Sequence, residues 1–178
     1  MPGVAHLDFV ARMVAVLDRP RRILFACACA NRVREVLADY ERAPRRNADA
    51  ALRFLRDSLK TGEFDAVAAS GLCMALERDG AFAAAELELP VTYTLGTILS
   101  ALQCSLENSP DSAVRAAGGA LDAAMSTEAS GMLALDEETA WQRAALEALV
   151  GNRASELDAL ASLGALPPAW LLRLEGNL

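Results

Sequence analysis

The sequence predicts an all-α protein, and three observations lead to that prediction. Hydrophobic residues make up 53% of the 178 residues, and many of them are Ala and Leu, which are strong helix formers. Aromatic residues make up only 5%, and Val, Ile and Thr do not alternate with polar residues as they do in strands. The third observation is an uncharged stretch of 18 residues, 89–106, whose large apolar side chains recur at helical spacing. A chain of this length is expected to form one domain, residues 1–178, with a sizeable core.

Breaks in the helical pattern divide the chain into seven or eight helices packed as a bundle. Pro20 opens the second helix, Asn47 is the expected N-cap of the third, and Gly62 is expected to end it. Asp79 and Gly80 are expected to end the fourth helix, and segment 81–89 is either a short helix or a linker. The expected helices span residues 6–17, 21–42, 47–60, 64–78, 90–106, 110–125 (or on to 134), 136–150 (or on to 164) and 169–174.

The helix over residues 90–106 is expected at the centre of the bundle because no face of it carries a charge. Leu99 lies on its apolar stripe, so Leu99→Asp is expected to be among the most damaging substitutions. A second, polar stripe contains Thr97, Ser100 and Gln103. If these side chains are buried they need partners, which are either carbonyls of their own helix or a ligand in a pocket between helices.

Charge argues against nucleic acid as a partner, since the net charge is −7. Residues 1–60 carry 12 Lys and Arg against 7 Asp and Glu, whereas residues 61–178 carry 5 against 17. The two parts could attract each other within one chain or between the chains of a homodimer, and solvated helix faces explain the same counts. The clustered arginines are expected in solvated loops, with an acidic partner or a phosphate as the alternative. They are Arg19, Arg21, Arg22, Arg45 and Arg46.

No arrangement of residues indicates a catalytic, cofactor-binding or metal site. The glycine-rich phosphate-binding patterns are missing, and the single histidine, His6, is expected to be exposed near the N-terminus. Asp136, Glu137 and Glu138 are interpreted as acidic residues at a helix N-terminus, where they complement the helix dipole. Enzymatic activity is therefore the less favoured hypothesis, and it is left open.

The cysteines favour a reducing compartment. Each of the four lies within an apolar helical pattern and is expected to be a free, buried thiol, which suits the cytoplasm. No signal peptide or membrane-spanning segment is indicated, because Pro90 and Gln103 interrupt the one long uncharged stretch. The cysteines are Cys27, Cys29, Cys73 and Cys104.

The order of several motifs resembles the YjaG-like bacterial proteins, an all-helical family with no assigned activity. The resemblance begins in the second helix and continues through an aliphatic helix at 52–59 and a later helix rich in Ala and Leu. It ends with an acidic, Trp-bearing helix near residue 136, so that it covers about residues 7–163. It implies an all-helical fold and no particular chemistry. The residues that carry it are Phe25, Ala26, Cys27, Ala28, Cys29, Arg32, Tyr40, Tyr93, Gly96, Ala101 and Leu102.

Three functions are compatible with these features. The first is a non-enzymatic role through protein association, as a homodimer or with another partner, for which Trp170, Leu171 and Leu174 are the candidate interface. The second is binding of a small molecule, or catalysis, in a pocket lined by Thr97 and its polar neighbours. The third is an immunity or antitoxin-like role in which the acidic surface masks a basic toxin.

Overall fold

The computed structural model describes residues 2–38, 43–86, 88–126 and 131–151 of the chain. Over these ranges it contains seven α-helices, one 3₁₀-helix and no strand, so the predicted all-α fold is confirmed. The elements are α1 (Pro2–Ala15), α2 (Arg19–Val33), the 3₁₀-helix η1 (Arg34–Leu37), α3 (Ala43–Thr61), α4 (Ala66–Ala85), α5 (Leu89–Glu107), α6 (Pro110–Ser126) and α7 (Gly131–Val150).

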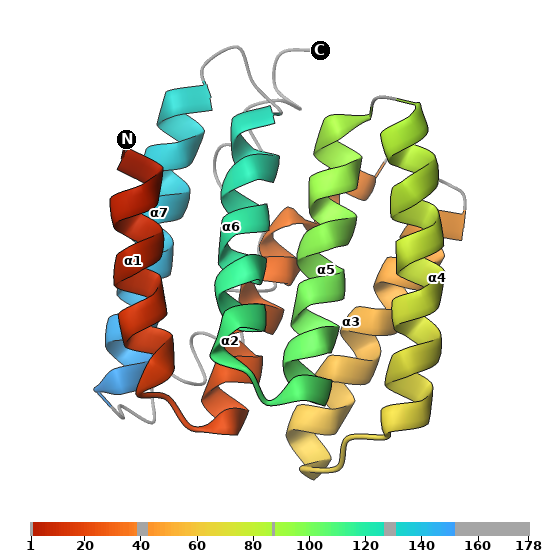
Figure 1. The fold of residues 1–178 in the computed structure, drawn as a ribbon, viewed down its shortest axis with the longest axis horizontal. Helices are drawn as coiled ribbons and strands as arrows, with labels where there is room; N and C mark the ends of the chain where they lie inside the picture. The colour runs from red at the N-terminus through yellow and green to blue at the C-terminus, as the bar shows by residue number, and fades with distance from the viewer. Residues whose placement is uncertain (1, 39–42, 87, 127–130, 152–178) are drawn as a thin grey trace.

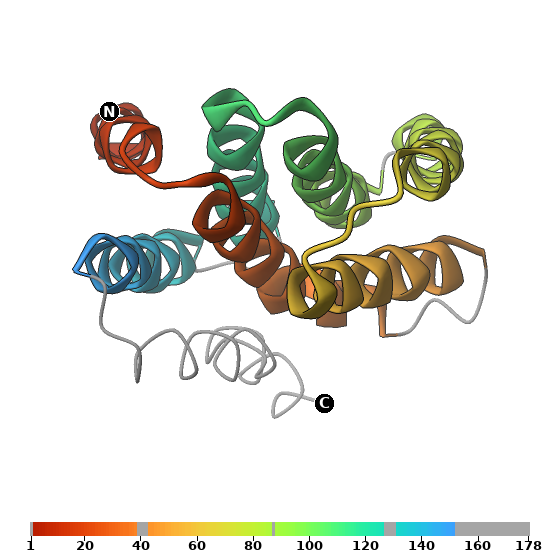
Figure 2. The same ribbon diagram turned by 90° about the horizontal axis from the view of Figure 1, so that it is seen from below.

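The helices form two layers (Figure 1). Seen from below in Figure 2, α1, α6, α5 and α4 lie side by side in one layer, and α7, α2 and α3 form the other. Contacts between the layers agree with this arrangement, since α2 packs on both α5 and α6 while α7 packs on α1 and α6. The four-helix layer therefore has α1 at one edge and α4 at the other.

The core lies where α5 faces α2 and α6, as the uncharged helix predicts. Leu95, Ile98 and Leu102 of α5 are almost completely buried. Leu99 is half-buried at the border of the buried face and packs against the core, so the expected damage from Leu99→Asp stays a prediction. The buried stripe is centred on Leu95, Ile98 and Leu102, and Leu99 lies beside it.

Small side chains let α5 and α6 approach closely. The buried face of α6 is built mainly from alanines, and Gly119 lies directly against Thr97. A Cβ at Gly119 would lie 2.5 Å from Thr97 Oγ1, so a larger residue there would displace the Thr97 hydroxyl. The Ala-rich composition thus sets the spacing of the four-helix layer.

Several helix ends follow their expected signals. Gly62 adopts a φ of 74°, in the left-handed region that glycine tolerates, immediately after α3. At the start of α6, the Asp111 backbone N–H donates to Ser109 Oγ over 3.2 Å. Asp18 and Asp65 cap α2 and α4 in the same way.

Other ends differ from the sequence-based expectation because tertiary contacts outweigh local signals. Asn47 lies inside α3 instead of capping it, and its Nδ2 donates to Asp79 Oδ2 over 2.7 Å. That bond satisfies Asp79 within α4, which continues past Gly80 to Ala85. The expected long second helix ends at Val33 and continues as a 3₁₀ turn. No helix in the described part of the chain combines the length and hydropathy that a membrane-spanning segment requires.

Candidate functional site: a buried polar network and an exposed apolar face

A buried ion pair joins α2 and α7, two neighbouring helices of the three-helix layer (Figure 2). Arg32 of α2 donates from Nε to Glu138 Oε2 of α7 over 2.9 Å, and Glu138 is fully buried. The Trp141 ring covers the other side of the guanidinium, whose central carbon lies 4.3 Å from the ring centroid. Glu138 was expected in the first turn of a helix starting at Asp136. That interpretation was wrong, because α7 begins at Gly131 and puts this carboxylate on its inner face.

The second carboxylate oxygen of Glu138 is linked, through Gln142, to His6 of the N-terminal helix α1. Gln142 Nε2 donates to Glu138 Oε1 over 3.3 Å and to the Ala117 carbonyl of α6 over 3.1 Å. Its Oε1 lies 2.9 Å from His6 Nε2, so the imidazole is the donor in this bond. His6 is therefore buried on α1 and not exposed, which corrects the prediction from the sequence. Arg32, Glu138, Gln142 and His6 are referred to below as the polar network.

The polar network fits a structural role better than a catalytic one. Both oxygens of Glu138 already accept hydrogen bonds, from Arg32 and from Gln142, so neither is directed at an open reaction site. Cys29 lies near the ion pair, and burial raises the pKa of its thiol well above the ordinary value, with a further rise from Glu138. A thiol in that state is a poor nucleophile at neutral pH. The network connects α1, α2, α6 and α7.

The three predicted pocket residues lie in different surroundings on α5. Thr97 Oγ1 donates to the Tyr93 carbonyl of its own helix over 2.8 Å, and it packs against Gly119. Ser100 is buried, whereas Gln103 is half-buried near the turn between α5 and α6. The helix carbonyl thus satisfies Thr97 without a ligand, and a pocket at these residues stays a prediction.

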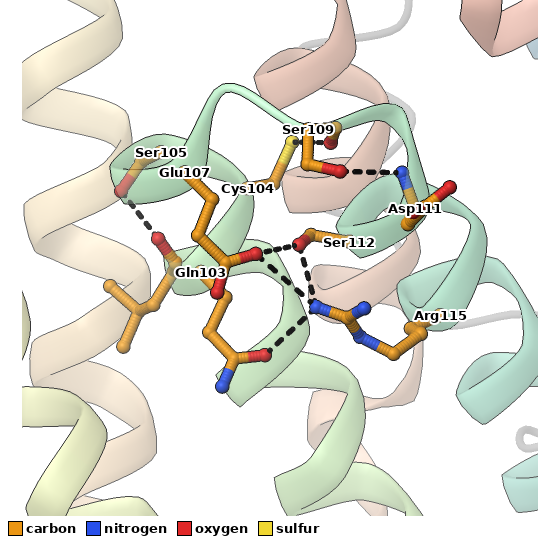
Figure 3. Close-up of polar contacts among 9 residues, drawn as sticks. Gln103, Cys104, Ser105, Glu107, Ser109, Asp111, Ser112 and Arg115 are labelled. Carbon is orange, nitrogen blue, oxygen red and sulfur yellow. Dashed lines mark hydrogen bonds and ion pairs between the residues drawn. The ribbon is translucent and has the colours of Figure 1, made fainter.

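Gln103 belongs to a polar cluster that closes the α5–α6 turn (Figure 3). Arg115 Nη2 donates to Ser112 Oγ over 2.7 Å and lies 3.3 Å from Gln103 Oε1. Glu107 Oε2 accepts from Ser112 Oγ over 2.7 Å and pairs with Arg115 at 3.4 Å. These contacts join α5 to α6 next to the turn between them. Their simplest role is to stabilise that turn.

The arginines expected in solvated loops instead lie on helices. Arg19 Nη2 donates to the Ser105 carbonyl over 2.6 Å, and Arg22 Nη1 donates to the Asn108 carbonyl over 3.1 Å. These carbonyls lie at the C-terminal end of α5, where positive charge is favourable. Arg45 and Arg46 lie within α3. The interpretation as loop charge was wrong because α2 and α3 both begin earlier than the sequence pattern indicated.

The thiols are buried and unpaired with one another, as predicted. Burial raises the pKa of Cys27 to about 12 and that of Cys104 to about 11, so neither is ionised at neutral pH. Within the described ranges, no cluster of three or more His, Cys, Asp or Glu side chains is arranged to hold a metal ion. The candidate interface residues Trp170, Leu171 and Leu174 lie outside the described residues.

The outward face of α4 is the feature that the sequence interpretation missed. Val67, Met74 and Phe82 are 83%, 67% and 62% exposed, and they lie about two helical turns apart on one side of the helix. The buried stripe of α4 lies on another side of the helix and contains Cys73, Leu76 and Ala83. The helix therefore carries apolar residues on both sides. We refer to Val67, Met74 and Phe82 as the α4 face.

Comparison with known proteins does not assign this chain to a family. No family model, no curated protein and no solved structure matches it. The resemblance to the YjaG-like proteins therefore stays a prediction, and function has to be inferred from the residues of the chain itself.

Proposed function

We propose that this protein acts by associating with a protein partner, either a second copy of itself or a different chain, through the α4 face. The observation that carries the proposal is the exposure of Val67, Met74 and Phe82 on one side of one helix. Single exposed apolar residues are common on protein surfaces, but several in register on one helix are typical of an interaction site.

The position of α4 supports this proposal. It lies at the edge of its layer and packs on α5 and α3, so the α4 face points away from the rest of the described structure (Figure 2). α4 carries large apolar side chains on two sides, and α5 and α3 cover only one of them. A partner on the α4 face would provide the missing cover.

Photo-cross-linking in cells tests the proposal. A photoreactive residue in place of Met74 is expected to form an adduct with a protein, and the adduct is expected to vanish when Val67 and Phe82 are both changed to Ser. A photoreactive residue in place of Val16, which is 70% exposed at the other edge, is the matched control. Adducts of equal yield at both positions, or at neither, would contradict association through α4.

A second candidate function, ligand binding between helices, has one observation in its favour. Thr94 of α5 is completely buried, and its Oγ1 has no hydrogen-bond partner among the described residues. A ligand with a polar group could satisfy it. Native mass spectrometry of protein purified from its own host would then show a bound small molecule, and Thr94→Val would reduce its occupancy. A bare polypeptide mass for the unchanged protein would count against this function.

A further inference from the structure

The solvent-facing side of α3 carries a row of basic side chains. Arg46, Arg53 and Lys60 are separated by seven residues each, so they lie nearly in line along the helix, about 10.5 Å from one another. Arg56 lies beside this line, and Asp57 lies on it between Arg53 and Lys60. All five side chains are exposed. We refer to these five residues as the α3 row, and its four basic groups and one acidic group leave it strongly positive.

The rest of the described structure does not neutralise the α3 row. None of its basic side chains forms an ion pair with another described residue. Asp49 of the same helix is engaged elsewhere, since its Oδ1 accepts from Arg34 Nε over 2.6 Å. Arg56 Nε donates only to the Leu52 carbonyl of its own helix, over 3.4 Å. The described helices that pack on α3 are α2, α4 and α5, and the row points away from them (Figure 2).

Basic side chains on the other described helices are mostly engaged within the protein. They donate to carboxylates or to helix-end carbonyls, or they lie over aromatic rings. Outside α3, only Arg12 and Arg78 among the described basic residues have no such contact, and they lie on two different helices. The unpaired positive charge of the described structure is therefore concentrated in the α3 row.

We propose that the α3 row binds an acidic helix of a partner protein. Carboxylates two turns apart on that helix would meet Arg46, Arg53 and Lys60, because a helix lying along α3 has the same repeat of about 10.5 Å. Complementary charges of this kind steer association and fix the register of the two surfaces. This site is separate from the α4 face, and it does not depend on the proposed association there.

Asp57 indicates a polypeptide partner rather than another kind of polyanion. A nucleic-acid backbone and an anionic bilayer both present negative charge, which the Asp57 carboxylate would repel. A polypeptide can place a Lys or Arg opposite Asp57 and carboxylates on either side of it. A helix that binds a bilayer surface also inserts large apolar side chains, and among the described residues no such side chain of α3 is exposed. The partner helix is therefore acidic, with one basic residue within its acidic row.

Fluorescence anisotropy with labelled helical peptides tests this inference on the full-length purified chain. The first probe has Glu at three positions seven residues apart and a Lys between two of them, in two versions that suit parallel and antiparallel packing. The second probe has Glu in place of that Lys, and the third is a DNA duplex of similar length. The first probe should bind most tightly, and Arg53→Gln should weaken its binding about three- to fivefold. Arg78→Gln is the matched control and should leave binding unchanged.

Reversing the charge of Asp57 tests the register. The Asp57→Lys variant should prefer the second probe to the first, by about three- to fivefold, because the Lys of the first probe then faces a like charge. The row is exposed, so thermal melting should not change in any of these variants and serves as the folding control. Val67→Ser with Phe82→Ser should leave peptide binding unchanged. A loss of binding in that variant would place the peptide on the α4 face and overturn the assignment to α3.

Two further results would overturn the inference. Tighter binding of the DNA duplex than of either peptide, with the same dependence on Arg53, would assign the row to nucleic acid. Equal binding of all three probes, or binding of none, would show that the row has no selective partner. An equal loss in Arg53→Gln and Arg78→Gln would show that the peptides respond only to the total charge of the protein.

Discussion

The two edge helices of the four-helix layer, α1 and α4, occupy equivalent places but have different outward surfaces. The exposed side of α1 is formed by small or charged residues such as Ala5, Asp8 and Arg12. The exposed side of α4 is formed by Val67 and Phe82, among others. An edge position therefore does not by itself require large apolar side chains toward solvent. The difference supports the proposed role of the α4 face in association.

The two edges are also held in different ways. α1 packs on α6 and α7 through buried residues such as Val10 and Val14. It is also held by polar contacts, since its His6 contacts Gln142 of α7 and the Arg143 guanidinium carbon lies 4.6 Å from the Phe9 ring centroid. α4 is attached mainly by apolar packing on α5 and by the bond between Asn47 and Asp79. We therefore expect substitutions near α1 to change stability and substitutions on the outside of α4 to change association.

The largest effect on stability is expected from Glu138→Ala. The substitution leaves Arg32 buried beside Trp141 without its carboxylate, which should cost about 3–5 kcal/mol in the free energy of unfolding. Chemical denaturation measures the change. Association through the α4 face should be unaffected under conditions where the variant remains folded.

Two further variants make the Glu138 prediction specific. Glu147→Ala removes an exposed carboxylate from the same helix and should change stability by no more than about 0.5 kcal/mol. Replacing Arg32 and Glu138 together by Met should recover most of the loss, since no unpaired charge then remains. A Glu138→Ala protein as stable as Glu147→Ala would show that the network does not hold the α1 edge.

A smaller, more local effect is expected from Gln142→Ala. Removing this amide leaves His6 Nε2 and the Ala117 carbonyl without their contacts, at a cost of about 1–3 kcal/mol. Gln103→Ala is the matched control, because that amide is half-buried at a surface turn. Hydrogen exchange should increase in α1 more than in α4. Equal increases in both helices would mean that the two edges are not held independently.

The sequence was sufficient to predict the helical class, the central helix and the buried thiols, because these follow from patterns within single segments. Uncharged runs and apolar spacing locate α5, and small apolar surroundings bury Cys27. The polar network could not be predicted in this way. Arg32 and Glu138 are 106 residues apart, and each alone has the appearance of a surface charge. The only available signal was that Arg32 follows a segment that is apolar on all sides.

The α4 face was missed for a different reason. Its apolar residues are visible in the sequence, but a helix with two apolar stripes does not reveal which stripe faces the core. Val67 and Leu76 differ in burial because α5 and α3 cover one side only, and that is a property of the tertiary arrangement. The signal available in the sequence was the presence of apolar residues on two sides of this helix.

The last expected effect concerns the core that lies between the two edges, and it appears only at alkaline pH. Burial raises the pKa of Cys27 to about 12 and that of Cys104 to about 11, whereas in the unfolded chain both thiols ionise near about 8.5. The folded state therefore retains protons that the unfolded state loses. The stability from each thiol is complete below about pH 8.5 and is lost, at about 1.4 kcal/mol per pH unit, as the pH rises toward the folded-state pKa.

Replacing Cys27 and Cys104 together by Ala should flatten this part of the stability–pH profile. The quantity compared is the slope of stability against pH. The cavity that the substitutions create lowers stability by a similar amount at every pH, so it does not change that slope. Cys27 lies in α2 and Cys104 in α5, and both helices belong to the core shared by the two edges. High pH should therefore increase hydrogen exchange in α1 and α4 alike, whereas Gln142→Ala should increase it mainly in α1. If the double variant kept the slope of the unchanged protein between about pH 9 and 10.5, other groups would control alkaline unfolding. If only one edge opened, the core would not couple α1 to α4.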